Sequence, residues 1–315
     1  MNKPLLSICI PTYNRKEYLE KCLNAIVKQK SFDDRVEIVI SDNCSTDGTQ
    51  KLCEKYQKDY SNIHYYRNEE NMADKNFSLL LQRASGVLRK LTNDTVVYKT
   101  NSINYILEAI ENNIDERPQL YFKNRGKSGT LRVDSLEDYI NSISYHITWI
   151  GAIALWEEDC DDLNILTKNS ETLLGQVPML VENFRRHKSA IIYDDIIMEG
   201  GRPRPKNVNY GLYRVFYVNF LGFMKSYVDE KCISNKCYEK LRKDLLLSFF
   251  AQWVVNYKLN NGEYIFSDEN LKELVENTYR KEKYFYKYKL MLIYYGLIVY
   301  AQKFKDRIGY GNGHK

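Results

Sequence analysis

The chain of 315 residues lacks the short patterns that mark several common kinds of binding site. No G-x-G-x-x-G follows its first apolar run, and there is no G-x-x-x-x-G-K, so neither a dinucleotide-binding fingerprint nor a P-loop is present. Its histidines and cysteines form no cluster with the spacing of zinc ligands, and no Ser/His/Asp arrangement can be picked out. The sequence therefore gives no support to these nucleotide, zinc and hydrolase sites.

Long apolar runs, strong charge and paired cysteines are also missing. No segment approaches the roughly 20 apolar residues of a membrane-spanning helix. The net charge of +5 is mild and evenly spread, so nucleic acid is not an expected partner. The seven cysteines include no C-x-x-C pair, and the chain does not open with a secretory signal pattern. We therefore expect a cytoplasmic protein with reduced thiols.

What the sequence does contain is a strand, a tight polar turn and a helix near its start. Residues 5–10 are a short apolar, β-branched run, which is typical of a buried strand. Pro11 is expected to end this strand because it cannot donate to a sheet ladder, and Asn14 is expected to cap the following helix. Apolar side chains then recur at helical spacing over residues 18–26.

The same arrangement recurs twice within the first 85 residues. Residues 36–40 and 63–66 predict two further strands, and helical apolar spacing follows each of them. Three strand–helix units predict an α/β fold with a mostly parallel, doubly wound sheet. Because ligands of such sheets collect at the carboxyl ends of the strands, the polar turns there are the candidate binding site.

These turns carry ordered motifs that resemble a known family. I-P-T-Y-N-R at residues 10–15, S-D-N-C-S-T-D-G at 41–48 and N-E-E-N at 68–71 resemble the nucleotide-sugar half of inverting family 2 glycosyltransferases, which have the GT-A fold. The likeness is clearest over roughly residues 3–110. It implies transfer of a sugar from a nucleoside-diphosphate sugar, with UDP as the expected nucleotide, to a hydroxyl of a glycan or polyprenyl-linked glycan. The implied pathway is synthesis of a bacterial surface polysaccharide such as O-antigen or capsule.

The resemblance also implies which residues touch the donor. Asp42 would accept a hydrogen bond from the base. The residues that would border the rest of the nucleotide are Pro11, Thr12, Tyr13, Asn14, Arg15, Asn43 and Asn93. Taken singly, Asn14 and Asp42 fit better as plain turn or cap residues, which is the commonest use of Asn and Asp. Their joint order and spacing favour the binding role.

The acidic run that holds a divalent cation in the family is reduced here to N-D-T at residues 93–95. Asp94 falls where a metal-contacting acid is expected, so the resemblance implies a manganese or magnesium ion held by Asp94 and the donor diphosphate. Such an ion would offset the charge that develops on the leaving nucleoside diphosphate, which makes Asp94 a predicted catalytic residue. The alternative is that Asp94 is a lone acid in a turn.

The general base is harder to place. The family's acidic pair falls at residues 176–177, which are Gln and Val here, and neither can take a proton from a hydroxyl. Glu171 is the preferred substitute, with Glu182 as an alternative, while the acidic residues 157–162 are expected to form an exposed loop. For His146, a structural role and a role in binding the acceptor are equally good interpretations. The missing pair also fits a GT-A-like scaffold protein that has lost catalysis.

The predicted organisation has three parts. They are a GT-A catalytic domain over residues 1–205 (donor half 1–100, acceptor half 101–205), a C-terminal helical extension over 206–308 and a disordered tail over 309–315. The basic stretch G-G-R-P-R-P-K at 200–206 is either a phosphate-binding flap, through Arg202, Arg204 and Lys206, or an ordinary linker.

The last long segment has an unusual composition. Within residues 280–307, Lys and Arg flank a twelve-residue apolar run rich in tyrosine. This composition suits a helix lying at an anionic membrane surface, which would make the protein a peripheral membrane protein. A homodimer interface and an ordinary packed helix are the alternatives.

Overall fold

The computed structural model describes residues 3–161, 164, 169–200, 210–259, 266–267 and 270–309. The chain divides into two compact units, Met1–Pro203 and Arg204–Lys315, which are described separately below. The predicted domain boundary at 205, the basic residues Arg202, Arg204 and Lys206, and the tail from 310 onward lie outside the described residues.

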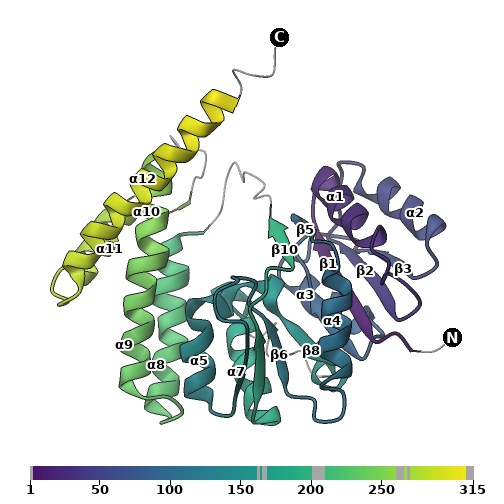
Figure 1. The fold of residues 1–315 in the computed structure, drawn as a ribbon, viewed down its shortest axis with the longest axis horizontal. Helices are drawn as coiled ribbons and strands as arrows, with labels where there is room; N and C mark the ends of the chain where they lie inside the picture. The colour runs from purple at the N-terminus through teal and green to yellow at the C-terminus, as the bar shows by residue number, and fades with distance from the viewer. Residues whose placement is uncertain are drawn as a thin grey trace. The chain divides into compact units, whose positions relative to one another are not determined.

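A five-stranded sheet forms the first part of unit 1 (Figure 1). Its order is β3 (Ile63–Arg67), β2 (Val36–Asp42), β1 (Leu6–Thr12), β4 (Leu88–Leu91) and β8 (Ala154–Trp156). All neighbouring pairs are parallel except the last, in which β8 runs antiparallel to β4. The predicted mostly parallel sheet is therefore confirmed.

Helices cover both faces of this sheet, and the central strands β1 and β2 are buried on both sides. Alternate residues of β1, among them Leu6, Ile8 and Ile10, join one core with α1 (Lys16–Val27) and α2 (Thr49–Asp59). The other face of β1 and β2 packs against α3 (Lys75–Arg83). The helix α4 (Ser102–Glu111) buries a stripe of isoleucine and leucine in the first core.

Pro11 does not end the first strand, which corrects the sequence prediction. The strand runs through Pro11 to Thr12, in register with Ser41 and Asp42 of β2. In a parallel sheet, the backbone groups of successive residues in a strand point alternately to the neighbouring strand on one side and to the one on the other side. The carbonyl of Cys9 accepts from Thr92 beside β4, so Pro11 faces the same side, where β4 has already ended. Its missing N–H therefore costs no ladder bond.

The remainder of unit 1 is built from shorter elements. A second sheet places β9 (Ala190–Tyr193) between parallel β6 (Gln119–Phe122) and antiparallel β7 (Thr130–Val133), and β5 (Val96–Tyr98) pairs with β10 (Met198–Gly200). The helical elements of this part are α5 (Leu136–Ile143), α7 (Gln176–His187) and the 3-10 turns η1 (Ser144–Thr148), η2 (Ile150–Ala152), η3 (Glu157–Cys160) and η4 (Ser170–Thr172).

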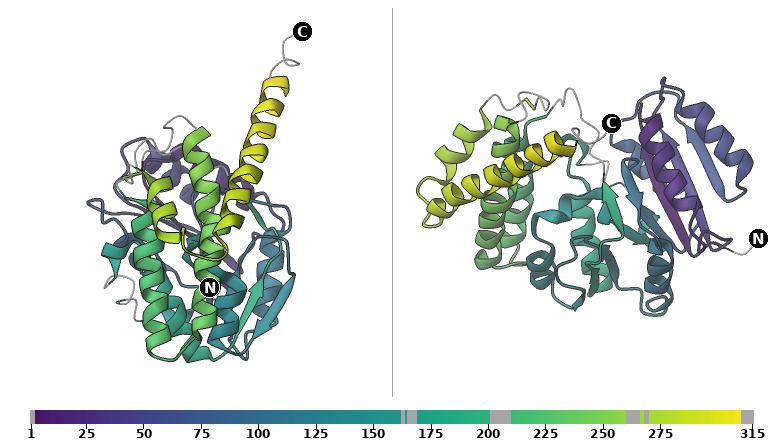
Figure 2. Two further views of the ribbon diagram at one scale, coloured as in Figure 1. Left: turned by 90° about the vertical axis from the view of Figure 1, so that its left-hand side faces the viewer. Right: turned by 45° about the horizontal axis from the view of Figure 1, so that its top comes forward.

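The regular elements described in unit 2 are all helical, which confirms the predicted C-terminal helices (Figure 2). Its elements are η5 (Tyr213–Phe220), α8 (Leu221–Asp229), α9 (Asn235–Asp244), η6 (Leu245–Phe250), α10 (Ala251–Leu259), α11 (Leu271–Tyr279) and α12 (Phe285–Gly309). Among the described residues, no helix combines the length and the apolar character that crossing a membrane requires.

Candidate active site

The carboxyl ends of β1 and β4 meet at Asp94. Its side chain is only 1% exposed, and Thr12 donates its hydroxyl to Oδ2 at 2.9 Å. Arg15, whose side chain is 46% exposed, pairs with Oδ1 at 3.2 Å. Burial raises the pKa of Asp94, while Arg15 and Thr12 act in the opposite direction. The result is a buried carboxylate that reaches solvent through one exposed cation, Arg15.

Asp42, at the end of β2, is also wholly buried. It accepts a hydrogen bond from the backbone N–H of Ser45 at 2.9 Å and one from the hydroxyl of Tyr65 at 2.8 Å. The backbone N–H of Asn43 donates to the carbonyl of Thr12, which joins the ends of β1 and β2. We call Thr12, Arg15, Asp42 and Asp94 the donor edge.

The first two motifs hold each other in place through side chains. Asn14 accepts from the backbone N–H of Thr46 at 2.7 Å, and its own N–H donates to Ser45 Oγ at 2.9 Å. Asn14 has a φ of +51°, a left-handed conformation that asparagine tolerates. Asn14 was predicted to cap α1, but in the structure it does not. Instead Asp47 accepts the backbone N–H of Lys16, in the first turn of that helix, at 2.9 Å.

A polar network behind β2 was not foreseen as a unit. Asn43 donates to Asn71 at 2.7 Å and accepts the backbone N–H of Met72 at 2.8 Å, which ties the N-E-E-N turn to the second motif. Arg83 donates to Ser41 at 2.7 Å and to Asn68 at 3.0 Å. Nothing in the sequence singled out Arg83, and only the position of α3 against β2 reveals its role.

The other predicted donor residues are less buried. Tyr13 is 45% exposed, while Pro11 and Asn93 are half-buried. The structure thus places the predicted donor residues at the carboxyl ends of β1 and β2 and on the turns after β1, β2 and β4. Among them, hydrogen bonds join Thr12, Arg15 and Asp94 directly.

The predicted base lies in a different setting. We call His146, Glu171 and Gln176 the acceptor side. Glu171 is exposed in η4, whereas Gln176 is buried at the start of α7 and donates to the carbonyl of Thr148 at 2.9 Å. Glu182 is exposed in the middle of α7 and pairs with Arg185 at 3.5 Å.

His146 is partly buried and its ring lies 4.4 Å from that of Tyr145. Burial, together with the nearby charges of Arg125 and Lys123, lowers the pKa of His146 to about 4. The imidazole is therefore neutral near pH 7. Its carbonyl accepts the hydroxyl of Tyr121, which fastens η1 to β6.

The acidic stretch after β8 is not a simple exposed loop, which corrects that expectation. Asp159 is buried, accepts from His187 at 2.9 Å and pairs with Arg186 at 3.0 Å, both at the end of α7. Glu157 and Glu158 share Arg117. Asp162 lies outside the described residues. Asp159 therefore holds the end of α7 to the segment that follows β8.

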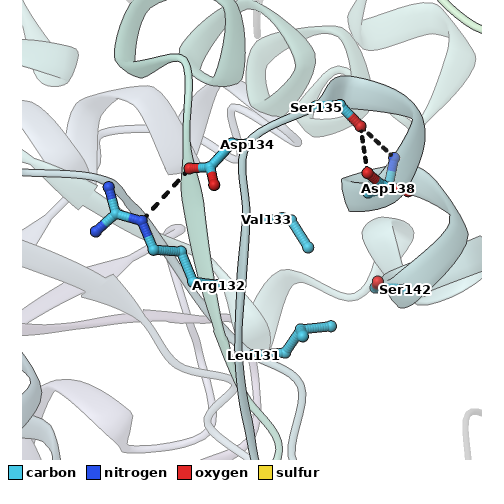
Figure 3. Close-up of a pocket in the computed structure, with 7 residues that line it drawn as sticks. All are labelled: Leu131, Arg132, Val133, Asp134, Ser135, Asp138 and Ser142. Carbon is cyan, nitrogen blue, oxygen red and sulfur yellow. Dashed lines mark hydrogen bonds and ion pairs between the residues drawn. The ribbon is translucent and has the colours of Figure 1, made fainter.

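One cavity of about 540 Å³ lies between β7 and α5 (Figure 3). Most of its polar side chains already have partners: Arg132 pairs with Asp134, and Ser135 caps α5 by accepting the N–H of Asp138 at 3.1 Å. None of the predicted site residues lines it. We assign it no part in the candidate site.

A preformed metal cage is not seen among the described residues. No three His, Cys, Asp or Glu side chains come together there in a way that could hold an ion. Asp94 is the acid at the donor edge that reaches an exposed cation, through Oδ1 and Arg15.

Comparison with known proteins assigns this edge to a class. Residues 7–125 match the model described as Glycosyl transferase family 2. This range contains β1 to β4 with their turns, and therefore the whole donor edge. Over this range, the chain is similar to glycosyl transferase family 2, which agrees with the resemblance seen in its motifs.

Curated relatives resemble part of the chain. Abequosyltransferase RfbV of Salmonella typhimurium is 34% identical over 148 residues, which is 46% of this chain and 41% of that protein. The putative teichuronic acid biosynthesis glycosyltransferase TuaG of Bacillus subtilis is 38% identical over 69 residues, 22% of this chain and 27% of that protein. The chain thus spans less than half the length of these relatives.

Solved structures extend the likeness in fold to nearly the whole chain. S. aureus TarS covers 92% of this chain, and 54% of its own, with a TM-score of 0.56 at 15% identity. A mannosyltransferase from Pyrobaculum calidifontis, solved with GDP-Man and Mn2+, covers 94% of this chain and 88% of its own, with a TM-score of 0.52 at 14% identity. The predicted fold class is confirmed.

Proposed function

We propose that the protein is an inverting glycosyltransferase that moves one sugar from a nucleoside-diphosphate sugar to a hydroxyl of a glycan or polyprenyl-linked glycan. The pathway we propose is bacterial surface polysaccharide synthesis, of the O-antigen or capsule type. The observation that supports this most strongly is the donor edge, where Asp94 is held by Thr12 and Arg15 beside the Asp42 turn.

The donor edge suggests a division of labour. Asp42 would accept from the base and Tyr13 and Asn14 would border the nucleotide, with UDP as the first candidate. S. aureus TarS has been solved with UDP-GlcNAc, so UDP is the first nucleotide to try in the test below. Arg15 is exposed and positively charged, so it can offset charge on the diphosphate as the nucleotide leaves.

A divalent cation, manganese or magnesium, fits this edge only in part. Asp94 offers one carboxylate oxygen, Oδ1, at the side that Arg15 now occupies. Hard cations accept oxygen ligands from substrate phosphates and water, so one carboxylate together with a diphosphate can suffice. When bound, the ion would supply positive charge to the leaving diphosphate. We therefore propose that it binds with the donor rather than before it.

On the acceptor side we retain Glu171 as the proposed general base, since it carries a carboxylate and is accessible. Single displacement with a base that takes the acceptor proton inverts the anomeric centre. We further propose a cytoplasmic protein that works at the inner face of the membrane, where a polyprenyl-linked acceptor would be available.

The test is a thermal-shift panel with the diphosphates of uridine, guanosine, thymidine and cytidine and their sugar conjugates. Each ligand is run with manganese and with EDTA, on the native chain, on Asp94→Asn and on the control Asp134→Asn, which removes an exposed acid. A ligand that binds the native state raises its melting temperature. A metal-dependent shift with one nucleotide, retained by the control and lost in Asp94→Asn, supports the proposal.

No shift with any nucleotide contradicts the donor site. A shift without turnover favours the second candidate, a GT-A-like scaffold that holds a nucleotide sugar without transferring it. Gln176 is the specific observation behind that candidate. It stands where the family has an acid, and its amide is bound to the carbonyl of Thr148.

A further inference from the structure

Helix α12 carries a row of large apolar side chains that its own unit leaves uncovered. We call this row the exposed stripe. Its members are 57–72% exposed and are Tyr286, Leu290, Ile293, Leu297, Tyr300 and Phe304. On the opposite face of the helix, Tyr288 is fully buried, and α12 packs there against α10 and η6 (Figure 2).

The stripe follows one line along the helix. Its members are spaced by four, three, four, three and four residues. At about 100° per residue, this spacing confines them to an arc of about 80° of the helix circumference. A contiguous apolar band of this kind on a surface helix marks an interaction site rather than scattered surface residues.

The charges beside the stripe have one sign. Lys287 and Lys289 lie next to its first residues, and Lys303 lies near its end. No Asp or Glu occurs between Phe285 and Lys305. Lys287 lies over the ring of Tyr286, with Nζ 5.9 Å from the ring centre, and Lys289 pairs with Glu276 of α11 at 2.6 Å.

We propose that the exposed stripe docks α12 flat on the surface of an anionic phospholipid bilayer. The apolar side chains would enter the boundary between headgroups and acyl chains, while tyrosine hydroxyls and lysine ammonium groups stay at headgroup level. Each lysine near such a surface adds electrostatic attraction. The inference deepens the proposed function, which rests on a lipid-linked acceptor, but lipid binding itself needs neither donor nor acceptor.

A second copy of the chain fits the stripe less well. The spacing is that of a two-stranded coiled coil, with the stripe at its core positions. In such a pair the residues that flank the core on both sides face those of the partner helix. Here these flanking positions include Lys287, Lys289 and Lys303, so an antiparallel homodimer would bring Lys289 of one copy close to Lys303 of the other. An anionic surface complements all three.

The experiment is co-sedimentation of the full chain with phosphatidylcholine vesicles, with and without phosphatidylglycerol. We expect binding to the anionic vesicles only, weakened by salt. Leu290→Ser with Leu297→Ser should abolish it, whereas Val218→Ser, at an exposed apolar side chain elsewhere in unit 2, should not. Lys287→Gln with Lys303→Gln should weaken partitioning about 25-fold, from roughly fivefold per charge. Lys225→Gln with Lys236→Gln is the matched charge control.

Two results would overturn the proposal. One is vesicle binding that is absent, or that the stripe variants leave unchanged. The other is a dimer in solution, seen by light scattering, that Leu290→Ser with Leu297→Ser dissociates, since the stripe is then covered by a second copy. Both are independent of the nucleotide thermal shift, so failure of membrane docking and failure of the glycosyltransferase proposal can be told apart.

Discussion

The donor edge and the acceptor side use their polar side chains in opposite ways. At the donor edge, Asp42 and Asp94 are buried, and neighbouring turns donate to both oxygens of each carboxylate. On the acceptor side, Glu171 is exposed, and the buried Gln176 carries no charge. The first site is preorganised by the fold, whereas the second leaves its one predicted acid to solvent.

This difference follows from how each side is built. Parallel strands end at one edge of a sheet, so the side chains that follow β1, β2 and β4 converge whatever the rest of the chain does. The acceptor side is assembled from 3-10 turns and the start of one helix. Nothing comparable forces its side chains together, so its chemistry depends on the particular residues present.

The largest effect is expected at the donor edge. Asp94→Asn keeps the shape and the hydrogen bond from Thr12 but removes the charge that holds Arg15. We expect sugar transfer to fall about a thousandfold, which is the upper range for loss of one electrostatic contact in an active site. Turnover of the donor identified by thermal shift is the measurement. A loss of less than tenfold, with an unchanged melting temperature, would place the chemistry elsewhere.

On the acceptor side, Glu171→Gln should lower kcat about a hundredfold, because a general base contributes at least that much. Donor binding should stay the same, since the residue does not belong to the donor edge. The matched control is Glu182→Gln, an exposed acid of α7 that pairs with Arg185. Equal kcat in both variants would remove Glu171 from the mechanism and place the general base elsewhere.

The sequence predicted more of the donor edge than of the acceptor side, for reasons visible in single residues. Asp42 and Asp94 follow apolar strands, and strand ends can be found from the apolar pattern alone. The end of β1 was wrongly predicted at Pro11. Whether proline breaks this strand depends on where the neighbouring strand β4 ends, which the residue type alone does not reveal. Asn14 was assigned to the wrong partner, since Asp47 from another turn bonds the start of α1.

Long-range partners account for the other failures. Asp159 was expected in an exposed loop, but the end of α7 brings His187 and Arg186 to it. Arg83 was passed over because a helical arginine is usually solvated. In both cases the partners lie 15 to 42 residues away in the sequence, so no local pattern could have indicated them.

Some carboxylates outside the donor edge are also buried and hydrogen-bonded. Asp194 is one of them, and it tests whether such preorganisation is special to the donor edge. It follows β9, is wholly buried, and accepts the backbone N–H groups of Arg125, Lys127 and Ser128 at 2.8, 3.2 and 3.0 Å. Asp194→Ala would leave these donors unpaired, at a cost of about 2–3 kcal/mol. Urea unfolding of the native chain and the variant measures this loss of stability. Asp195→Ala, at the next residue, is the control and should cost less than half as much.

The smallest effect is expected at Lys90, which lies outside both the donor edge and the acceptor side. It is a residue of β4, wholly buried, and its ammonium nitrogen donates to the carbonyl of Gly151 in η2 at 2.6 Å. Burial lowers the pKa of Lys90 to about 7. From about pH 7 to about pH 9 the unfolded chain therefore holds a proton that the native chain lacks, so stability rises with pH, by up to about 1.4 kcal/mol per unit.

Lys90→Met keeps the length of the side chain and removes the titrating group, so this pH dependence should disappear from the variant. The measurement is urea unfolding of both proteins across that range. The difference between the two curves isolates Lys90, because other groups that titrate, such as the buried cysteines, contribute equally to both. If the curves run parallel, Lys90 stays charged in the native state. The carbonyl of Gly151 and the ring of Phe122, whose centre lies 5.3 Å from Nζ, would then suffice to stabilise the buried ammonium group.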